Sequence, residues 1–192
     1  MKICRWLLLP ACMVAWSCSG TSNDSNTNSN TQSSTCGQTC QDNEIGYGLD
    51  KTIWVLWNEN FAGQPSGAQN KTVNCPLGGT AQISGTTGVA SNGIDTVHLT
   101  LVLQDCANLN TGYSLAFSGT VSWDGSFNGS VGNTLTFKSA LLVISGDITL
   151  YDKPAVDETC AVSLTDSYDK NSTTQSAWLE GVICGRTVTV KS

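Results

Sequence analysis

The fold of this chain is decided by the stretch TVHLTLVLQ, residues 96–104, in which apolar and polar side chains alternate. Successive side chains of a β-strand point to opposite faces, so the apolar residues of this stretch share one side. These residues are Val97, Leu99, Leu101 and Leu103. A period of two is typical of a strand in an antiparallel sheet that has one buried face and one face in water.

The same alternation continues in YSLAFSGTVSW, residues 113–123, and several shorter segments rich in strand-forming residues surround it. Further strands are expected at residues 80–86, 134–138, 141–151, 159–165, 177–184 and 187–190. Asn92-Gly93 and Asp124-Gly125 are typical of tight turns between strands, and residues 64–71 are expected to form a loop. We therefore predict a mainly β domain of about eight strands, arranged as a curved antiparallel sheet, a sandwich or a barrel.

A Ser-Gly pair recurs inside three of the predicted strands, at Ser84-Gly85, Ser118-Gly119 and Ser145-Gly146. Glycine inside a strand marks a bulge, a bend or a close approach of another backbone. Three such positions predict a strongly curved sheet, which would wrap around a helix.

That helix is predicted at the N-terminal end of the domain, over residues 51–62. Ile53, Trp57 and Phe61 recur at four-residue steps, so they share one face of an amphipathic helix. Asp50 is the candidate N-cap, and Gly63 is the candidate residue just past the C-terminus.

The apolar stretch at residues 52–57 also fits a short buried strand, which is the alternative to a helix. If the segment is helical, its face with Trp54 and Trp57 is interpreted as part of the core, because tryptophan buries a large area. A platform on which a carbohydrate stacks is the other interpretation of the same two rings.

The chain begins with a segment typical of an export signal. Lys2 and Arg5 precede an apolar run over residues 6–16, and Ser17-Cys18 end it. A basic start, a short apolar core and a small residue before the cut make a secretory signal peptide. The run is too short for a membrane-spanning helix, which needs about 20 residues.

Because a cysteine ends the apolar run, the segment resembles the precursors of bacterial lipoproteins. The resemblance implies that Cys18 receives a diacylglycerol and that the signal is cut after Ser17. Since Ser19 follows the cysteine, it also implies an envelope location with an anchor in the outer membrane. Several lipid chains together hold a protein stably, because each buried methylene contributes about 0.8 kcal/mol. The expected partner is therefore a membrane.

We divide the chain into three parts. Residues 1–17 are the signal peptide, 18–40 are the lipidated cysteine and a tether, and 41–192 are a single β-rich domain with disulfides. Residues 19–35 contain no apolar side chain. Such a segment cannot bury enough surface to offset the entropy of ordering, so we predict a disordered spacer.

The charge of the chain excludes one class of partner. Two of the nine basic residues, Lys2 and Arg5, lie in the signal, so seven remain against fifteen acidic ones, and the mature net charge is −8. Nucleic-acid backbones demand clustered Lys and Arg, so we expect no nucleic-acid partner.

Six cysteines remain after the signal and Cys18, and an even number outside the cytoplasm predicts three disulfides. Of the 15 possible connectivities, we favour the one that pairs near neighbours. It joins Cys36 to Cys40, Cys75 to Cys106, and Cys160 to Cys184. A zinc site is the rival interpretation, but the chain has no Cys-x-x-Cys and one histidine, so we predict no metal and no cofactor.

The sequence contains few candidates for catalysis. His98, on the polar side of its strand, lacks the Gly-x-Ser-x-Gly motif expected around a nucleophilic serine. Residues 124–129 resemble the first half of a calcium loop, but Leu135 stands where the twelfth-position acid is required, so a hairpin is preferred. The acids that could pair for glycoside hydrolysis are Asp105, Asp147, Asp157, Glu158 and Glu180. Glu180 could form a site with Arg186 if its strand face is buried.

The domain also resembles uncharacterised secreted β-rich lipoproteins in short patches, which carry no function. The patches are residues 75–79, Asp105-Cys106 and residues 184–186. We expect a membrane-anchored exported lipoprotein with a binding or structural role in the envelope, and an enzyme is the less favoured class. The alternatives are a carbohydrate-active enzyme with paired carboxylates and a carrier of a hydrophobic ligand in a groove between helix and sheet.

Overall fold

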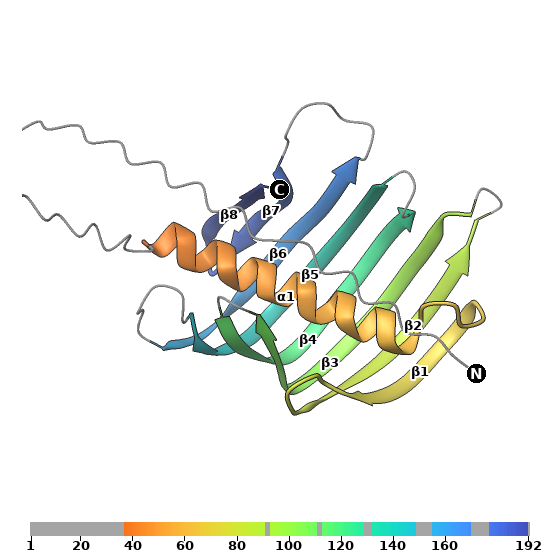
Figure 1. Ribbon diagram of the computed structural model, residues 1–192, viewed down its shortest axis with the longest axis horizontal. Coiled ribbons are helices and arrows are strands. Elements are labelled where there is room, and N and C mark those ends of the chain that lie inside the picture. The colour runs from red at the N-terminus through yellow and green to blue at the C-terminus, as the bar shows by residue number, and fades with distance from the viewer. Residues whose placement is uncertain are drawn as a thin grey trace, which may run out of the picture. The chain divides into compact units, whose positions relative to one another are not determined.

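A helix crosses one face of an eight-stranded antiparallel sheet in the computed structural model, which describes residues 37–90, 93–110, 113–128, 132–148, 155–169 and 177–191 (Figure 1). The prediction of a mainly β domain with about eight strands and one helix is confirmed for these residues. The elements are α1 (Gln38–Asn60), β1 (Gly67–Asn74), β2 (Thr80–Val89), β3 (Asp95–Asn110), β4 (Tyr113–Asn128), β5 (Gly132–Asp147), β6 (Val156–Asp169), β7 (Ala177–Ile183) and β8 (Arg186–Lys191).

The strands form one meander, in which each strand pairs with the next one along the chain. The sheet is open, with β1 and β8 at its two edges, so it is neither a closed barrel nor a sandwich of two sheets. Helix α1 lies on the apolar face and takes the place that a second sheet would have in a sandwich.

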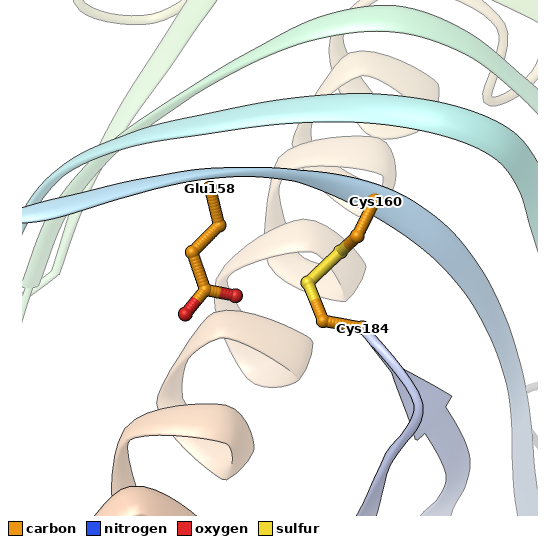
Figure 2. A group of neighbouring side chains, drawn as sticks. All are labelled: Glu158, Cys160 and Cys184. Atoms are coloured by element: carbon orange, nitrogen blue, oxygen red, sulfur yellow. A yellow bond between two sulfur atoms is a disulfide. The ribbon is translucent and has the colours of Figure 1, made fainter.

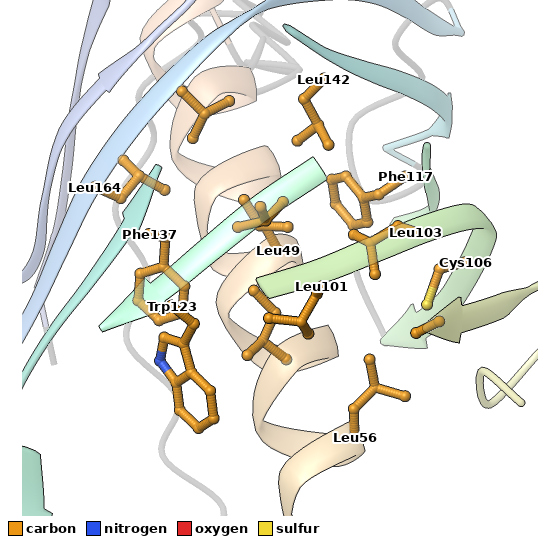
Figure 3. Packing of buried hydrophobic residues seen from close by; sticks show 14 of the residues in the cluster. Leu49, Leu56, Leu101, Leu103, Cys106, Phe117, Trp123, Phe137, Leu142 and Leu164 are labelled. Atoms are coloured by element: carbon orange, nitrogen blue, oxygen red, sulfur yellow. The ribbon is translucent and has the colours of Figure 1, made fainter. Parts of the chain in front are cut away.

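The stretch that decides the fold behaves as predicted. Val97, Leu99, Leu101 and Leu103 of β3 are at most 2% exposed, and His98 and Thr100 between them are exposed. The buried side chains of the sheet meet those of α1 in one apolar core, which includes Leu49, Leu56, Trp123 and Phe137 (Figure 3).

One loop prediction was wrong, and two of the predicted strands are parts of a single strand. Residues 64–71 do not form a loop throughout, because β1 begins at Gly67 and pairs with β2 along its whole length. Its sequence, GAQNKTVN, is mostly polar because it is an edge strand with little buried surface. Segments 134–138 and 141–151 belong largely to the single strand β5, which continues through an irregularity between Ser139 and Leu142.

Of the two predicted turns, the structure supports the one at Gly93 and contradicts the one at Asp124-Gly125. Gly93 lies in a turn between β2 and β3, where its N–H donates to the Ala90 carbonyl at 2.9 Å; Asn92 is outside the described residues. Asp124-Gly125, in contrast, lies inside β4, opposite Leu135 of β5, so neither a hairpin turn nor a calcium loop forms there. Gly125 instead lies where the backbone of β5 comes close to β4, as the glycines of the Ser-Gly pairs do at their own strands.

Glycine is required at these positions by contact between neighbouring strands. Gly85, Gly119 and Gly146 all have positive φ, and a Cβ on any of them would lie 2.0–2.7 Å from a carbonyl oxygen of a neighbouring strand. Of the three roles expected for these glycines, all three positions show the close approach of a neighbouring backbone, and the strands bend beneath the helix (Figure 1).

Alanine at Gly125 is expected to destabilise the domain more than alanine at Gly67. The two glycines have similar φ angles, 139° and 133°, so both substitutions strain the backbone, by about 1–3 kcal/mol. A Cβ at Gly125 would also lie 2.1 Å from the Thr134 carbonyl oxygen, whereas nothing lies within 4 Å at Gly67. We expect G125A to cost about 1–3 kcal/mol beyond G67A in urea unfolding. Equal costs would show that the strands move apart freely.

The helix begins thirteen residues before the predicted start at Lys51, and its N-cap is Gly37 rather than Asp50. Residues 38–40 of the predicted tether are therefore helical. The helix was expected to be amphipathic, but its buried face includes Asp42, Asp50 and Thr52 as well as apolar residues. Such a face gives a weak apolar stripe, which explains why sequence periodicity located only the last three turns. Gly63, with φ of 74°, follows the helix end as predicted.

Candidate functional site

A recess of about 270 Å³ lies where the middle of α1 meets strands β5, β6 and β7. One turn of the helix supplies Asp50, Lys51 and Trp54. The sheet supplies Asn133, Asp166, Tyr168 and Trp178. The strand register brings the sheet residues together, because Asn133 is opposite Tyr168 and Asp166 is opposite Leu179, next to Trp178. The recess opens at the surface, since Tyr168 is 49% exposed.

Asp50 is the most unusual side chain of this recess. It is 1% exposed, and neither carboxyl oxygen has a hydrogen-bond partner. The pKa of Asp50 is raised to about 8: burial is the largest cause and the negative charge of Asp166 adds to it, whereas the Lys51 ammonium and the nearby Trp54 indole N–H lower it. Asp50 is therefore a neutral carboxylic acid near pH 7, able to donate one hydrogen bond and accept others.

Asp166 is the second buried acid, 2% exposed. Its Oδ2 accepts a hydrogen bond from the Trp54 indole N–H at 3.3 Å. Burial raises the pKa of Asp166, while the side chains of Asn133 and Trp54 lower it by hydrogen bonding. The recess thus brings together two carboxyl groups, one on the helix and one on the sheet, with one indole linking the two elements.

Aromatic rings form much of the recess wall. The Trp54 ring packs edge-on against Phe127 and Trp123, at centroid distances of 5.0 and 5.7 Å, so it is anchored in the core. The Lys51 ammonium lies 5.6 Å from the Trp178 ring centroid and 5.2 Å from that of Tyr47. Cation–π attraction therefore holds a positive charge at the rim of the recess.

The acids named from the sequence as candidates for glycoside hydrolysis do not line this recess. Asp105 accepts a hydrogen bond from the Ser118 hydroxyl at 2.9 Å, and Asp147, Asp157 and Glu180 are exposed. The strand face that carries Glu180 is therefore exposed to solvent, and this acid is not buried. His98 is exposed on the outer face, as expected, with its Nδ1 3.2 Å from Asp124.

Arg186 pairs with acids other than Glu180. Its Nε lies 2.9 Å from Oδ2 of Asp42, and its Nη2 lies 2.9 Å from Oδ1 of the same carboxylate. Nη2 also donates to Glu158. The hydrogen bonds to Asp42 and Glu158 raise the pKa of Arg186. The pair links α1 to β8, and it is buried on its Asp42 side, where the side chain is 2% exposed, while Arg186 remains partly exposed.

Two of the favoured disulfides are present, Cys75–Cys106 and Cys160–Cys184. Cys40 is also disulfide-bonded, whereas its predicted partner Cys36, like the lipidation residue Cys18, lies outside the described residues. Glu158 lies beside the second bridge, with its carboxylate within 4.8 Å of both sulfurs (Figure 2). Sulfurs in a disulfide are not the thiolates that bind metal, and Arg186 already engages the carboxylate, so this group is structural.

Comparison with known proteins gives no identity for the chain: no family model, no curated protein and no solved structure matches it. No helix among the described residues is long and apolar enough to cross a membrane. The assignment of function therefore rests on the site itself.

Sequence reasoning missed both acids of the recess. Asp50 was predicted to be a helix cap, but it lies on the buried face of a longer helix, one position after the buried Leu49. Asp166 follows the predicted strand 159–165 by one residue and continues the inward alternation of Val162 and Leu164. The signal that could have found it is an acid in register with two buried apolar residues of the same strand.

Proposed function

We propose that this chain is an exported, membrane-anchored lipoprotein that binds a small ligand in the recess between α1 and β5–β7. The single observation that carries the proposal is Asp50, a fully buried acid with two unpartnered oxygens bordering an aromatic-lined hollow. Buried polar groups without partners are rare and costly, so they are expected where a ligand supplies the missing hydrogen bond.

The proposed location rests on the signal segment and on the cysteines. Disulfides persist outside the reducing cytoplasm, so the pairs Cys75–Cys106 and Cys160–Cys184 favour an exported domain. The resemblance of residues 1–18 to lipoprotein precursors supports an anchor at Cys18 in the outer membrane.

Tandem mass spectrometry of the N-terminal peptide, from protein purified from its own cells, tests this location. We expect a peptide that begins at Cys18 and carries a diacylglyceryl mass. An unmodified N-terminus at Ser19 or beyond would refute the anchor while leaving the recess untouched.

Occupancy of the recess is testable with the tryptophans themselves. Four tryptophans follow residue 17: Trp54 and Trp178 line the recess, and Trp57 and Trp123 are 8% and 1% exposed in the core. We expect a ligand to shift the indole N–H resonances of the first pair and to leave those of the core pair nearly unchanged. The probes are methyl β-glucopyranoside, tetramethylammonium chloride and sodium acetate, which are neutral, cationic and anionic.

The W178A variant, which removes one wall of the recess, should weaken the binding of whichever probe shifts the resonances by at least tenfold. V143A is the matched control, since Val143 is 39% exposed and does not line the recess. Absence of selective shifts with all three probes would contradict the proposed function.

Glycoside hydrolysis is a second candidate, because the recess brings two carboxyl groups together and the pKa of Asp50 keeps one of them protonated near pH 7. Glycosidases use such a pair, in which a protonated carboxyl group acts as general acid and a carboxylate acts as nucleophile or base. Release of nitrophenol from nitrophenyl glycosides, lost in D166N, would establish this activity.

The carrier of a hydrophobic ligand is less well supported. At Trp57 the helix packs directly on the sheet, since Trp57 stacks with Phe61 and contacts Trp123 edge-on at 5.5 Å. All three residues belong to the buried core.

A further inference from the structure

We infer that the ligand of the recess is a neutral polyhydroxylated ring, a single saccharide unit, held between aromatic side chains and the buried acids. This inference rests on the proposed binding function and adds the chemical class of the ligand. It follows from four properties of the recess: its size, its charge, its aromatic walls and its hydrogen-bonding groups.

The size limits the ligand to a small molecule. Pockets for drug-sized ligands begin at about 300 Å³. At about 270 Å³, the recess is slightly smaller, and it is open at the surface beside Tyr168. It therefore suits one ring of a sugar, with space outside for the remainder of a longer chain.

The charge of the recess favours a neutral ligand. The Lys51 ammonium already lies over the rings of Trp178 and Tyr47, so an incoming cation would have to compete with it for the same aromatic faces. An anion would meet the carboxylate of Asp166, which is buried and poorly screened. With Asp50 neutral, one positive and one negative charge remain, and they offset each other.

The walls and the polar groups match the two sides of a sugar ring. The C–H groups of a pyranose face pack on the negative face of an aromatic ring, which Tyr168 provides at the mouth, beside the Trp178 ring that Lys51 covers. Sugar hydroxyls both donate and accept hydrogen bonds, and the recess offers both functions in the neutral acid of Asp50 and the amide of Asn133. A ligand with hydroxyls around its edge supplies the partner that the Asp50 oxygens lack.

The test compares the three probes on the mature chain at pH 7, and then adds methyl glycosides of galactose, mannose and N-acetylglucosamine. We expect at least one glycoside to shift the indole resonances of Trp54 and Trp178 at a concentration at least tenfold below that needed for tetramethylammonium or acetate. Selective shifts by tetramethylammonium or acetate without any glycoside would overturn the saccharide inference and would leave the binding function standing. No shift by any probe would overturn both.

Two substitutions of Asp50 distinguish recognition from packing. D50N keeps a donor and an acceptor at the same place, so glycoside affinity should stay within about threefold of the wild type. D50L keeps a similar volume and removes every polar atom, so affinity should fall at least tenfold. Equal glycoside affinity of D50L and wild type would refute a role of Asp50 in recognition. If D50L does not fold, the tenfold loss expected for W178A carries the test.

Discussion

The D50N variant is expected to gain stability over the wild type as the pH rises, by about 1.4 kcal/mol for each pH unit between about pH 4 and pH 8. In the wild type, burial raises the pKa of Asp50 from 3.8 in the unfolded chain to about 8 in the folded protein. Between these values, the unfolded state has released the proton of Asp50 and the folded state still holds it.

The sign follows from proton binding. A group whose pKa is raised on folding contributes its stability fully below the unfolded pKa, and this contribution is lost as the pH rises to the folded pKa. Asparagine does not titrate, so D50N lacks this loss. Over the whole window the difference between the two proteins should reach about 6 kcal/mol, and above pH 8 it should become constant.

The measurement is urea unfolding of both proteins from pH 4 to pH 9 with the disulfides intact, and the quantity to plot is the difference in unfolding free energy against pH. E180Q removes one acid from the exposed face of the sheet, so it reports the effect of changing the net charge alone. A difference between D50N and wild type that does not vary with pH would show that Asp50 is ionised in the folded protein.

This titration is linked to the recess, because the acid that destabilises the fold is the acid proposed to meet a ligand. An unpartnered buried carboxyl group reduces stability, and proteins retain such groups where function requires them. A ligand that hydrogen-bonds Asp50 would compensate part of that cost on binding.

The sequence predicted most of the sheet because strand periodicity is local. The alternation of residues 96–104 requires only that one face be buried, and residues 97–103 of β3 have that arrangement. The Ser-Gly pairs were equally informative, since a glycine inside a strand reports a backbone contact that any larger residue would prevent. Strand β1 was missed because an edge strand buries little and so has no apolar face to detect.

The helix and the recess were harder to predict because their decisive residues depend on tertiary contacts. Gly46 lowers helix propensity, yet the fold needs it: a Cβ there would lie 3.0 Å from Cγ1 of Val188, so glycine lets α1 approach β8 closely. Asp42 and Asp50 interrupt the apolar stripe of the helix. The sequence does not show that Asp42 pairs with Arg186 of β8, or that Asp50 lies beside Asp166 of β6, because both relations depend on the tertiary fold.

Replacement of Arg186 by methionine is expected to destabilise the domain by about 3 kcal/mol. The substitution leaves the Asp42 carboxylate buried without its cation, and removal of one partner from a buried ion pair costs about 3–5 kcal/mol. The Asp42 side chain is 2% exposed but that of Arg186 is 34% exposed, so solvent screening places the expected cost at the lower end of the range. Urea unfolding at pH 7 measures it.

Three companion variants decide whether the buried charge of Asp42 is the cause. E158Q alters the other partner of Arg186, whose side chain is 27% exposed, and should cost at most about 1 kcal/mol. R186K should recover only part of the loss, because a lysine ammonium cannot make the paired contacts of the guanidinium. D42N/R186M should recover most of it, since the double substitution removes the buried charge together with its partner. If the double variant is as unstable as R186M, the loss comes from the packing of the arginine side chain between α1 and β8, and the ion pair is not what holds the helix to this edge of the sheet.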